Sequence, residues 1–177
     1  LPHVYLDGIK VFAIPDQSSA YAINESLRFS PDGENIVFYH YGSKSLHIRG
    51  TTNADFANVY HRYAFSPDGK LAYARYTENG MQLVVGNHAY PPFAGTLTGI
   101  TFSPNGDVIY GAHNWVAGGT NTEKPHAEVF INGTQQGRYD ALLPFPYNRE
   151  PRFFFDAPDR FHYFAVQDGV IERVEVK

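Results

Sequence analysis

The chain has 177 residues, a net charge of −4 and 43% hydrophobic residues, enough apolar material for the core of one domain. Its acidic balance, with both signs scattered along the sequence, disfavours nucleic acid as a partner. The absence of cysteine excludes disulfides, thiol nucleophiles and cysteine-ligated zinc, and no apolar run approaches the roughly 20 residues that span a bilayer.

Abundant Phe, Tyr, Gly and Pro indicate strands joined by tight turns, and the pattern repeats along the chain. A Ser-Pro-Asp/Asn-Gly corner occurs at 30–33, 66–69 and 103–106, and a degenerate copy, Ala-Pro-Asp-Arg, occupies 157–160. The proline presets φ for a type I turn, and the glycine supplies the left-handed residue that reverses the chain. Arg160 at the glycine position of the last copy predicts a strained or altered turn.

Each corner is flanked by predicted strands. A first strand ends at Phe29, Phe65 or Phe102. Second strands are predicted at 35–41, 71–76, 107–113 and 161–166, third strands at 45–50, 81–87, 127–133 and 170–176, and weaker fourth strands at 57–60, 91–95 and 137–140. No segment shows helical periodicity, so the repeat unit is interpreted as four antiparallel strands.

Four strands repeating every 36 to 37 residues favour a β-propeller over a sandwich, because a single blade cannot bury both of its faces. We therefore predict one all-β domain over residues 1–177, a small propeller of four-stranded antiparallel blades. Five blades result if the N-terminal segment completes the last blade and closes the ring. A four-bladed ring or an open piece of a larger propeller is the alternative.

The segment "FSPDGKLAYARYTENGMQLVVGN" (65–87) resembles the WD40-like repeat of TolB-type β-propellers. "EVFINGTQQGRYD" (128–140) resembles the second half of a relative of that repeat, in which the third strand ends in an Asn/Asp-Gly turn. "HVYLDGIKVFAI" (3–14) is similar to the same second half. The Gly-His and Trp-Asp signatures of true WD40 repeats are missing. The resemblance implies a bacterial periplasmic or extracytoplasmic location, and the start at Leu1 fits either a removed leader or a disordered or trimmed start.

The extra length of the third unit falls in a loop at 114–126 and in a crossing between blades at 141–151. Connections of a meander alternate between its two ends, so both insertions are predicted to leave from one side, which often is the binding side of a repeat protein. Aromatic and Arg side chains dominate interface hot spots. The predicted binding residues are Trp115, Phe145, Tyr147 and Arg149, with His61 and Arg62 in the crossing before the second full unit and Tyr76 near a loop.

Catalytic motifs are missing: there is no Gly-x-Ser-x-Gly elbow, His-Glu-x-x-His pair or phosphate-binding loop. The closest histidines, His40 and His47, fall on different predicted strands, so no metal site and no cofactor are predicted. The leading hypothesis is a non-enzymatic protein–protein scaffold or accessory subunit, bound to other subunits of a bacterial membrane-associated assembly on its periplasmic side. Alternatives are a small-ligand or carbohydrate-binding module that stacks sugars on Trp115 or Tyr147, and a glycosidase that uses Asp156.

Overall fold

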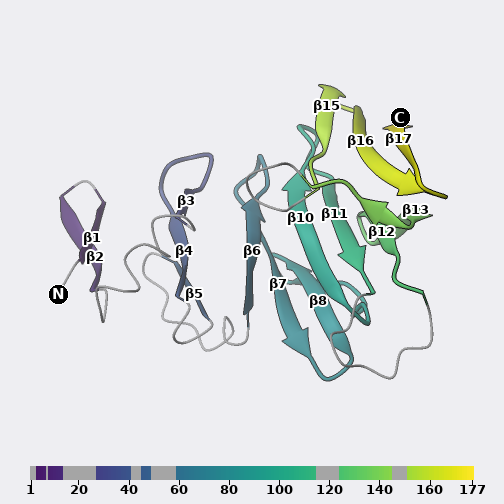
Figure 1. The fold of residues 1–177 in the computed structure, drawn as a ribbon. Coiled ribbons are helices and arrows are strands. Elements are labelled where there is room, and N and C mark those ends of the chain that lie inside the picture. The colour runs from purple at the N-terminus through teal and green to yellow at the C-terminus, as the bar shows by residue number, and fades with distance from the viewer. Residues whose placement is uncertain are drawn as a thin grey trace. The chain divides into compact units, whose positions relative to one another are not determined.

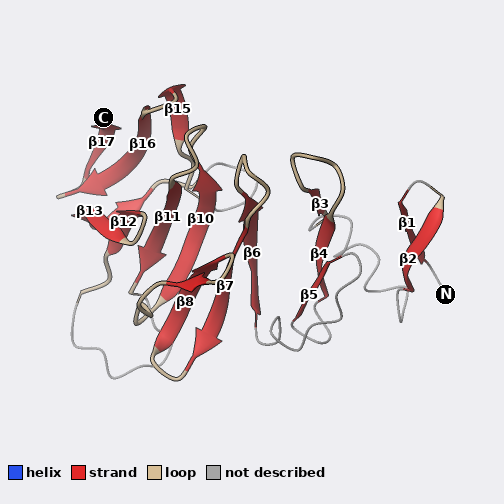
Figure 2. Cartoon of the chain, turned by 180° about the vertical axis from the view of Figure 1, so that it is seen from behind, coloured by secondary structure: helices blue, strands red, loops and turns tan. Residues whose placement is uncertain are grey.

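The computed structural model describes residues 3–6, 8–13, 27–40, 45–48, 59–114, 124–144 and 151–177. Every regular element in these ranges is a β-strand, and the sheets are antiparallel (Figure 2). This confirms the all-β prediction for the described part of the chain. None of these residues belongs to a helix long and apolar enough to cross a membrane. The chain divides into two compact units, residues 1–61 and 62–177, and each is described by itself.

The described residues before β6 form two sheets (Figure 1). Strands β1 (His3–Leu6) and β2 (Ile9–Ala13) form a hairpin, and β3 (Arg28–Phe29), β4 (Ile36–His40) and β5 (Ser45–Ile48) form a three-stranded sheet with β4 in the centre. All five residues of β4 are buried, as its continuous apolar sequence predicts for a central strand covered on both faces.

Two four-stranded meanders follow. The first runs β6 (Val59–Phe65), β7 (Leu71–Thr77), β8 (Gly80–Val85) and β9 (His88–Ala89); β6 crosses the boundary between the units. The second runs β10 (Thr96–Phe102), β11 (Val108–His113), β12 (Ala127–Ile131) and β13 (Thr134–Tyr139). The order of the first three strands within each repeat is therefore the predicted one.

The fourth strands needed correction. Residues 57–60 were predicted to form the fourth strand of the first sequence repeat, but Val59 and Tyr60 begin β6, the first strand of the next sheet. In the second sequence repeat the fourth strand is His88–Ala89, and the predicted segment 91–95 contributes only a bridge between Phe93 and Met81. The third prediction, 137–140, falls on β13. Pro91 and Pro92 lack the N–H that a continuing ladder requires, which explains why β9 stops early.

The last sheet has a split first strand. Strands β14 (Ala141–Leu142) and β15 (Phe154–Ala157) both pair with the same side of β16 (Arg160–Gln167), and β17 (Val170–Val176) pairs with its other side. β14 lies opposite Ala165 and Val166, and β15 lies opposite Phe161 and His162. One strand position is thus filled by two segments that are 11 residues apart in the sequence.

The three Ser-Pro-Asp/Asn-Gly corners have the predicted turn geometry. In each, the glycine N–H donates to the serine carbonyl at 2.9 Å, and the glycine φ is +73°, +81° or +91°. The serine side chain is buried and its Oγ accepts the backbone N–H that follows the turn; the donors are Asn35, Lys70 and Asp107. The corner is therefore a complete local hydrogen-bonding unit, which accounts for its repetition.

The degenerate fourth corner is an altered turn, as predicted. Ala157 pairs directly with Arg160, so Pro158 and Asp159 alone connect β15 to β16. Arg160 already belongs to β16 and does not need the left-handed φ of the glycine it replaces.

Alternate side chains of β16 are buried and form part of the core of this region. Phe161, Tyr163 and Ala165 are buried and pack with Ile109, Ala127, Val129 and Leu142. The Tyr163 hydroxyl lies 2.7 Å from the Tyr139 hydroxyl, and burial raises the pKa of Tyr163. The last sheet is therefore joined to β10–β13 by a packed apolar layer with a satisfied polar contact inside it.

Ser66→Ala is expected to lower the free energy of unfolding by about 1–2 kcal/mol, because Ser66 is 1% exposed and its Oγ donates to Asp68 and accepts the Lys70 N–H at 2.8 Å. Urea denaturation measures the loss. Hydrogen bonds from Lys70 and Ser66 lower the pKa of Asp68. The hydrogen bonds to ionised Asp68 therefore stabilise the fold above the ordinary aspartate pKa near 4, and this stabilisation disappears as the pH falls through the lowered pKa of Asp68. The free energy lost in Ser66→Ala should therefore be smaller in acid.

Ser103→Ala is the matched control. Ser103 Oγ accepts the Asp107 N–H in the same way, but its contact to a carboxylate, Asp107 Oδ2, is longer at 3.4 Å. The Ser103 substitution should cost less than the Ser66 substitution. Equal losses, independent of pH, would show that the serine–carboxylate contact does not contribute.

Candidate functional site

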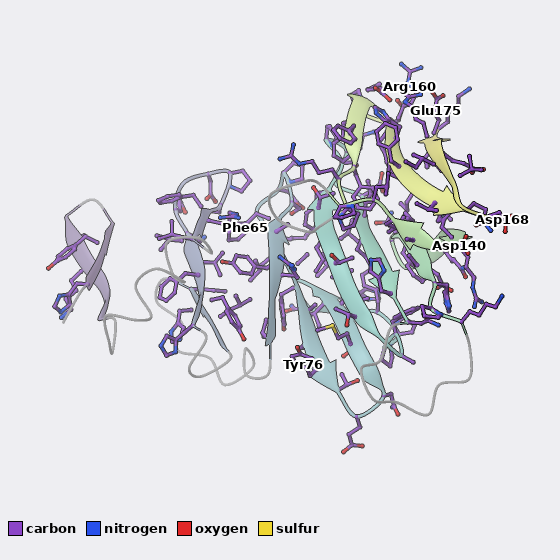
Figure 3. All side chains as sticks on the ribbon, viewed as in Figure 1. Phe65, Tyr76, Asp140, Arg160, Asp168 and Glu175 are labelled. Atoms are coloured by element: carbon purple, nitrogen blue, oxygen red, sulfur yellow. The ribbon has the colours of Figure 1, made fainter. Side chains whose placement is uncertain are left out.

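The sheets of residues 62–177 have two distinct ends. The Ser-Pro corners and the β12–β13 turn lie at one end, and the β7–β8 turn and the β11–β12 connection lie at the other. In Figure 3, Phe65, which precedes the Ser66 corner, and Tyr76, which precedes the β7–β8 turn, are labelled at opposite ends of the β6–β7 hairpin. We call the end that holds the β7–β8 turn and the β11–β12 connection the loop end.

One predicted binding residue presents a side chain at the loop end. Tyr76 lies just before the β7–β8 turn and is 50% exposed, which is unusual for a large aromatic residue. Arg62 is only partly buried, and both it and His61 lie within strand β6. Their predicted place in a crossing is therefore wrong. The strand begins at Val59, because the β-branched and aromatic residues before Phe65 extend the ladder further back than expected.

The four remaining binding residues lie outside the described residues: Trp115, Phe145, Tyr147 and Arg149. Their predicted role in contact stays a prediction. The residues on which both insertions are mounted are described, however, and they define how the candidate site is built.

The base of the β11–β12 connection is closed by a buried asparagine. Asn114 Oδ1 accepts the His126 backbone N–H at 2.6 Å, and its Nδ2 donates to the Lys124 carbonyl at 3.1 Å. Its own N–H donates to the His126 carbonyl at 3.1 Å. Asn114 is 6% exposed, so these bonds form away from water. The two ends of the connection are thereby fixed to one another.

A charged network continues from this base. His126 Nε2 lies 3.1 Å from Oε1 of Glu128, a buried carboxylate on β12. His126 Nδ1 lies 3.0 Å from Nη2 of Arg138 on β13 and 3.2 Å from the Lys124 carbonyl. At the end of β11, burial and then the nearby His126 lower the pKa of His113. The buried Glu128 carboxylate thus has the His126 ring as a hydrogen-bonding partner.

The connection from β9 to β10 packs against the base of the β11–β12 connection, which we call the loop base. A Cβ added to Gly95 would lie 2.0 Å from the His113 carbonyl oxygen and 2.9 Å from the Asn114 Cα. Only glycine permits this close approach of two backbones. The crossing, the end of β11 and the Asn114 contacts therefore form one tightly packed assembly.

The second insertion is mounted differently from the prediction. Residues 141–142 already pair with β16 as β14, so the insertion interrupts a strand instead of crossing between sheets. The Leu143 N–H still donates to the Phe164 carbonyl at 3.0 Å, and a bridge between Pro144 and Pro151 closes its base. The prediction that residues 141–151 form a crossing between blades is therefore wrong, and the prediction that both insertions leave from one side stays a prediction. Its prolines remove ladder donors, which explains the interruption.

Pro151 fits over small residues of the neighbouring sheet. A Cβ on Gly99 would lie 2.9 Å from Pro151 Cγ, and one on Gly111 would lie 3.4 Å from the same atom. Gly99 has φ +61° and sits at an irregularity in the β10–β11 register. The base of the second insertion is thus packed against the β10–β13 sheet.

The residues considered for metal or catalysis have other contacts. The rings of His40 and His47 lie 5.7 Å apart on neighbouring strands, and burial and then His40 lower the pKa of His47. Within the described ranges, no three His, Asp or Glu side chains are grouped to hold a metal ion. Asp156 binds His162 Nδ1 at 2.8 Å, and this hydrogen bond lowers its pKa. The lowered pKa disfavours Asp156 as a glycosidase general acid, which needs a raised pKa, but is compatible with a nucleophile or general base.

Sequence reasoning missed the polar residues of the loop base. Glu128 interrupts an otherwise apolar strand, Ala-Glu-Val-Phe-Ile, and His126 stands two positions before it on the same side of the chain. A carboxylate in an apolar strand and a histidine at that spacing are the available signals. Comparison with protein-family models and with curated proteins gave no match for the chain.

Proposed function

We propose that the protein is a non-enzymatic binding scaffold of β-propeller type, which contacts other protein subunits through its loop end. The observation that carries the proposal is the loop base itself. The two ends of the β11–β12 connection, Asn114 and residues 124–126, are hydrogen-bonded to each other at an end of the sheets that also presents the exposed Tyr76. These hydrogen bonds fix the two ends of the connection to each other, which suits a loop that serves in recognition.

Three features support the propeller. Four-stranded antiparallel meanders succeed one another, consecutive sheets of residues 62–177 pack together, and the repeated corner closes each first hairpin. The blade number and ring closure by the N-terminal segment stay predictions from the sequence. The resemblance to TolB-type repeats supports a periplasmic or extracytoplasmic place in a bacterial membrane-associated assembly.

The test is association. The tagged chain, expressed in its native cell, should co-purify with a partner subunit at a fixed ratio, and the triple variant Trp115→Ala/Tyr147→Ala/Arg149→Ala should lose at least 90% of it. Ile171→Ala is the control, because this residue is 63% exposed on β17 and belongs to neither insertion. It should bind like the wild type. Equal association of the triple variant would remove the proposed surface.

The carbohydrate alternative makes a different prediction. A module for free sugars should gain thermal stability in proportion to ligand saturation, and a glycan array would identify the sugar. A scaffold should show neither result. A saturable melting shift with a defined glycan, lost in Trp115→Ala, would replace the scaffold proposal.

A further inference from the structure

Strand β17 forms an edge of the last sheet (Figure 1). Its seven residues, Val170–Val176, pair with β16 along one side without a shift in register, and no described residue pairs with the other side. In the two preceding meanders a fourth strand, β9 or β13, occupies this position. A regular edge strand without proline or bulge offers a row of backbone donors and acceptors to another strand.

The hairpin that joins β16 to β17 determines which backbone groups face the open edge. Gln167 and Val170 close a two-residue turn in which both residues have positive φ, so they exchange backbone hydrogen bonds with each other. Every second residue after Val170 bonds β16 in the same way. Arg173 and Glu175 fall between these residues, so their N–H and C=O groups point away from β16.

Contacts on the far side of β16 lead to the same assignment. The Phe164 carbonyl accepts the Leu143 N–H at 3.0 Å and therefore points toward β14. Phe164 lies opposite Arg173 in the β16–β17 register. Opposite residues of an antiparallel pair either bond each other or both point outward, so the backbone groups of Arg173 face the open edge.

The side chains of these two outward-facing residues carry opposite charges. Arg173 forms an ion pair with Glu175, and its Nη2 lies 3.5 Å from Asp156 Oδ2. The Arg173 and Glu175 side chains are still 42% and 50% exposed, so each can contact a further group. Charges on an edge strand oppose self-pairing where like charges meet. Because the sign changes within two residues, the effect here depends on the register.

One two-fold symmetric register brings opposite charges together. An axis at Glu172, Arg173 or Glu175 sets that residue opposite its own copy, like charge against like. An axis at Val174 sets Arg173 opposite Glu175 of the second copy and brings the two Val174 residues face to face. The outward backbone groups of Arg173 and Glu175 then form a regular hydrogen-bonded pair across the two molecules.

We propose that the protein forms a symmetric dimer in which residues 172–176 pair antiparallel with the same segment of a second copy, centred on Val174. The last sheets of the two molecules join edge to edge into one continuous sheet. The interface uses no residue of either insertion, so it goes beyond the scaffold proposal and is tested on the purified chain. The N-terminal segment, which completes the last blade in the five-bladed prediction, is the competing occupant of this edge.

The first experiment is a charge exchange followed by sedimentation equilibrium of the whole chain. Arg173→Glu and Glu175→Arg each set like charges opposite each other, and each should weaken dimerisation at least about tenfold, although they change the net charge in opposite directions. The double variant restores opposite charges and should return to within about threefold of the wild type. Far-UV circular dichroism confirms that each variant is folded. A wild type that stays monomeric, or a double variant as weak as the single ones, would overturn the dimer.

The second experiment tests the register by cross-linking, since the chain has no cysteine of its own. The two Val174 residues form a non-hydrogen-bonded pair with Cα atoms about 4.5 Å apart, a separation that a disulfide can bridge. Mild oxidation of Val174→Cys should therefore give a covalent dimer. Glu172→Cys is the matched control, because its two copies lie roughly 13 Å apart along the strands and should not join. Cross-linking of Glu172→Cys in place of Val174→Cys would contradict the register.

Amide hydrogen exchange distinguishes the second copy from other occupants of the edge. The Arg173 and Glu175 amides should exchange fast in the monomer and slow down as the protein concentration rises through dimerisation. Slow exchange already in the monomer would show that a segment of the same chain covers the edge, and the proposal would be wrong. Loss of the scaffold proposal changes none of these results, so the two failures are distinguishable.

Discussion

Gly95→Ala is expected to lower the free energy of unfolding by about 2–4 kcal/mol. The new Cβ would lie 2.0 Å from the His113 carbonyl oxygen, 2.8 Å from Phe93 Cε1 and 2.9 Å from the Asn114 Cα. The first and third contacts are with backbone, which cannot rotate away as a side chain can. Urea denaturation followed by far-UV circular dichroism measures the loss.

Gly169→Ala separates this steric effect from the general cost of replacing glycine. Gly169 has φ +76°, but nothing lies within 4 Å of an added Cβ. Its substitution should cost about 1 kcal/mol, the strain of a left-handed alanine. Equal losses at the two positions would mean that the crossing before β10 does not approach β11 as closely as described.

The corner hairpins could be predicted because their causes are local. Proline fixes one φ, glycine supplies the left-handed residue, and the serine hydroxyl bonds the next backbone N–H, all within six residues. The second strands followed from the apolar runs after each corner, such as Ile36–His40. Even the failure of the fourth corner could be anticipated from Arg160 alone.

The split first strand could not be predicted, because its cause is not local. Ala141–Leu142 and Phe154–Ala157 are each too short to identify a strand, and only their shared pairing with β16 unites them. The start of β6 was misplaced for a similar reason: Val59 and Tyr60 fit the end of one sheet or the beginning of the next, and pairing decides.

The loop base was missed for a third reason. Asn114, His126, Glu128 and Arg138 come from three strand ends and a connection, and their mutual hydrogen bonds exist only after β11, β12 and β13 have paired. The sequence correctly indicated a long connection at 114–126. It did not indicate that a buried polar network, with Asn114 at its centre, fixes that connection to the sheet.

Asn114→Ala is accordingly expected to cost about 2–3 kcal/mol of unfolding free energy, because it leaves the His126 N–H and the Lys124 carbonyl without this partner at a buried site. Amide hydrogen exchange should show the local effect, with faster exchange at His126.

Asn79→Ala provides the matched comparison, since it removes the same side chain from an exposed position in the β7–β8 turn at the same end, and should change stability by less than about 0.5 kcal/mol. Asn114→Asp refines the result: it keeps an acceptor for the His126 N–H but sets a carboxylate against the Lys124 carbonyl, so it should restore slow exchange at His126 without restoring full stability. If Asn114→Ala instead behaved like Asn79→Ala, the hydrogen bonds of Asn114 would not hold the two ends of the β11–β12 connection together, and the proposed contact surface would lose this support.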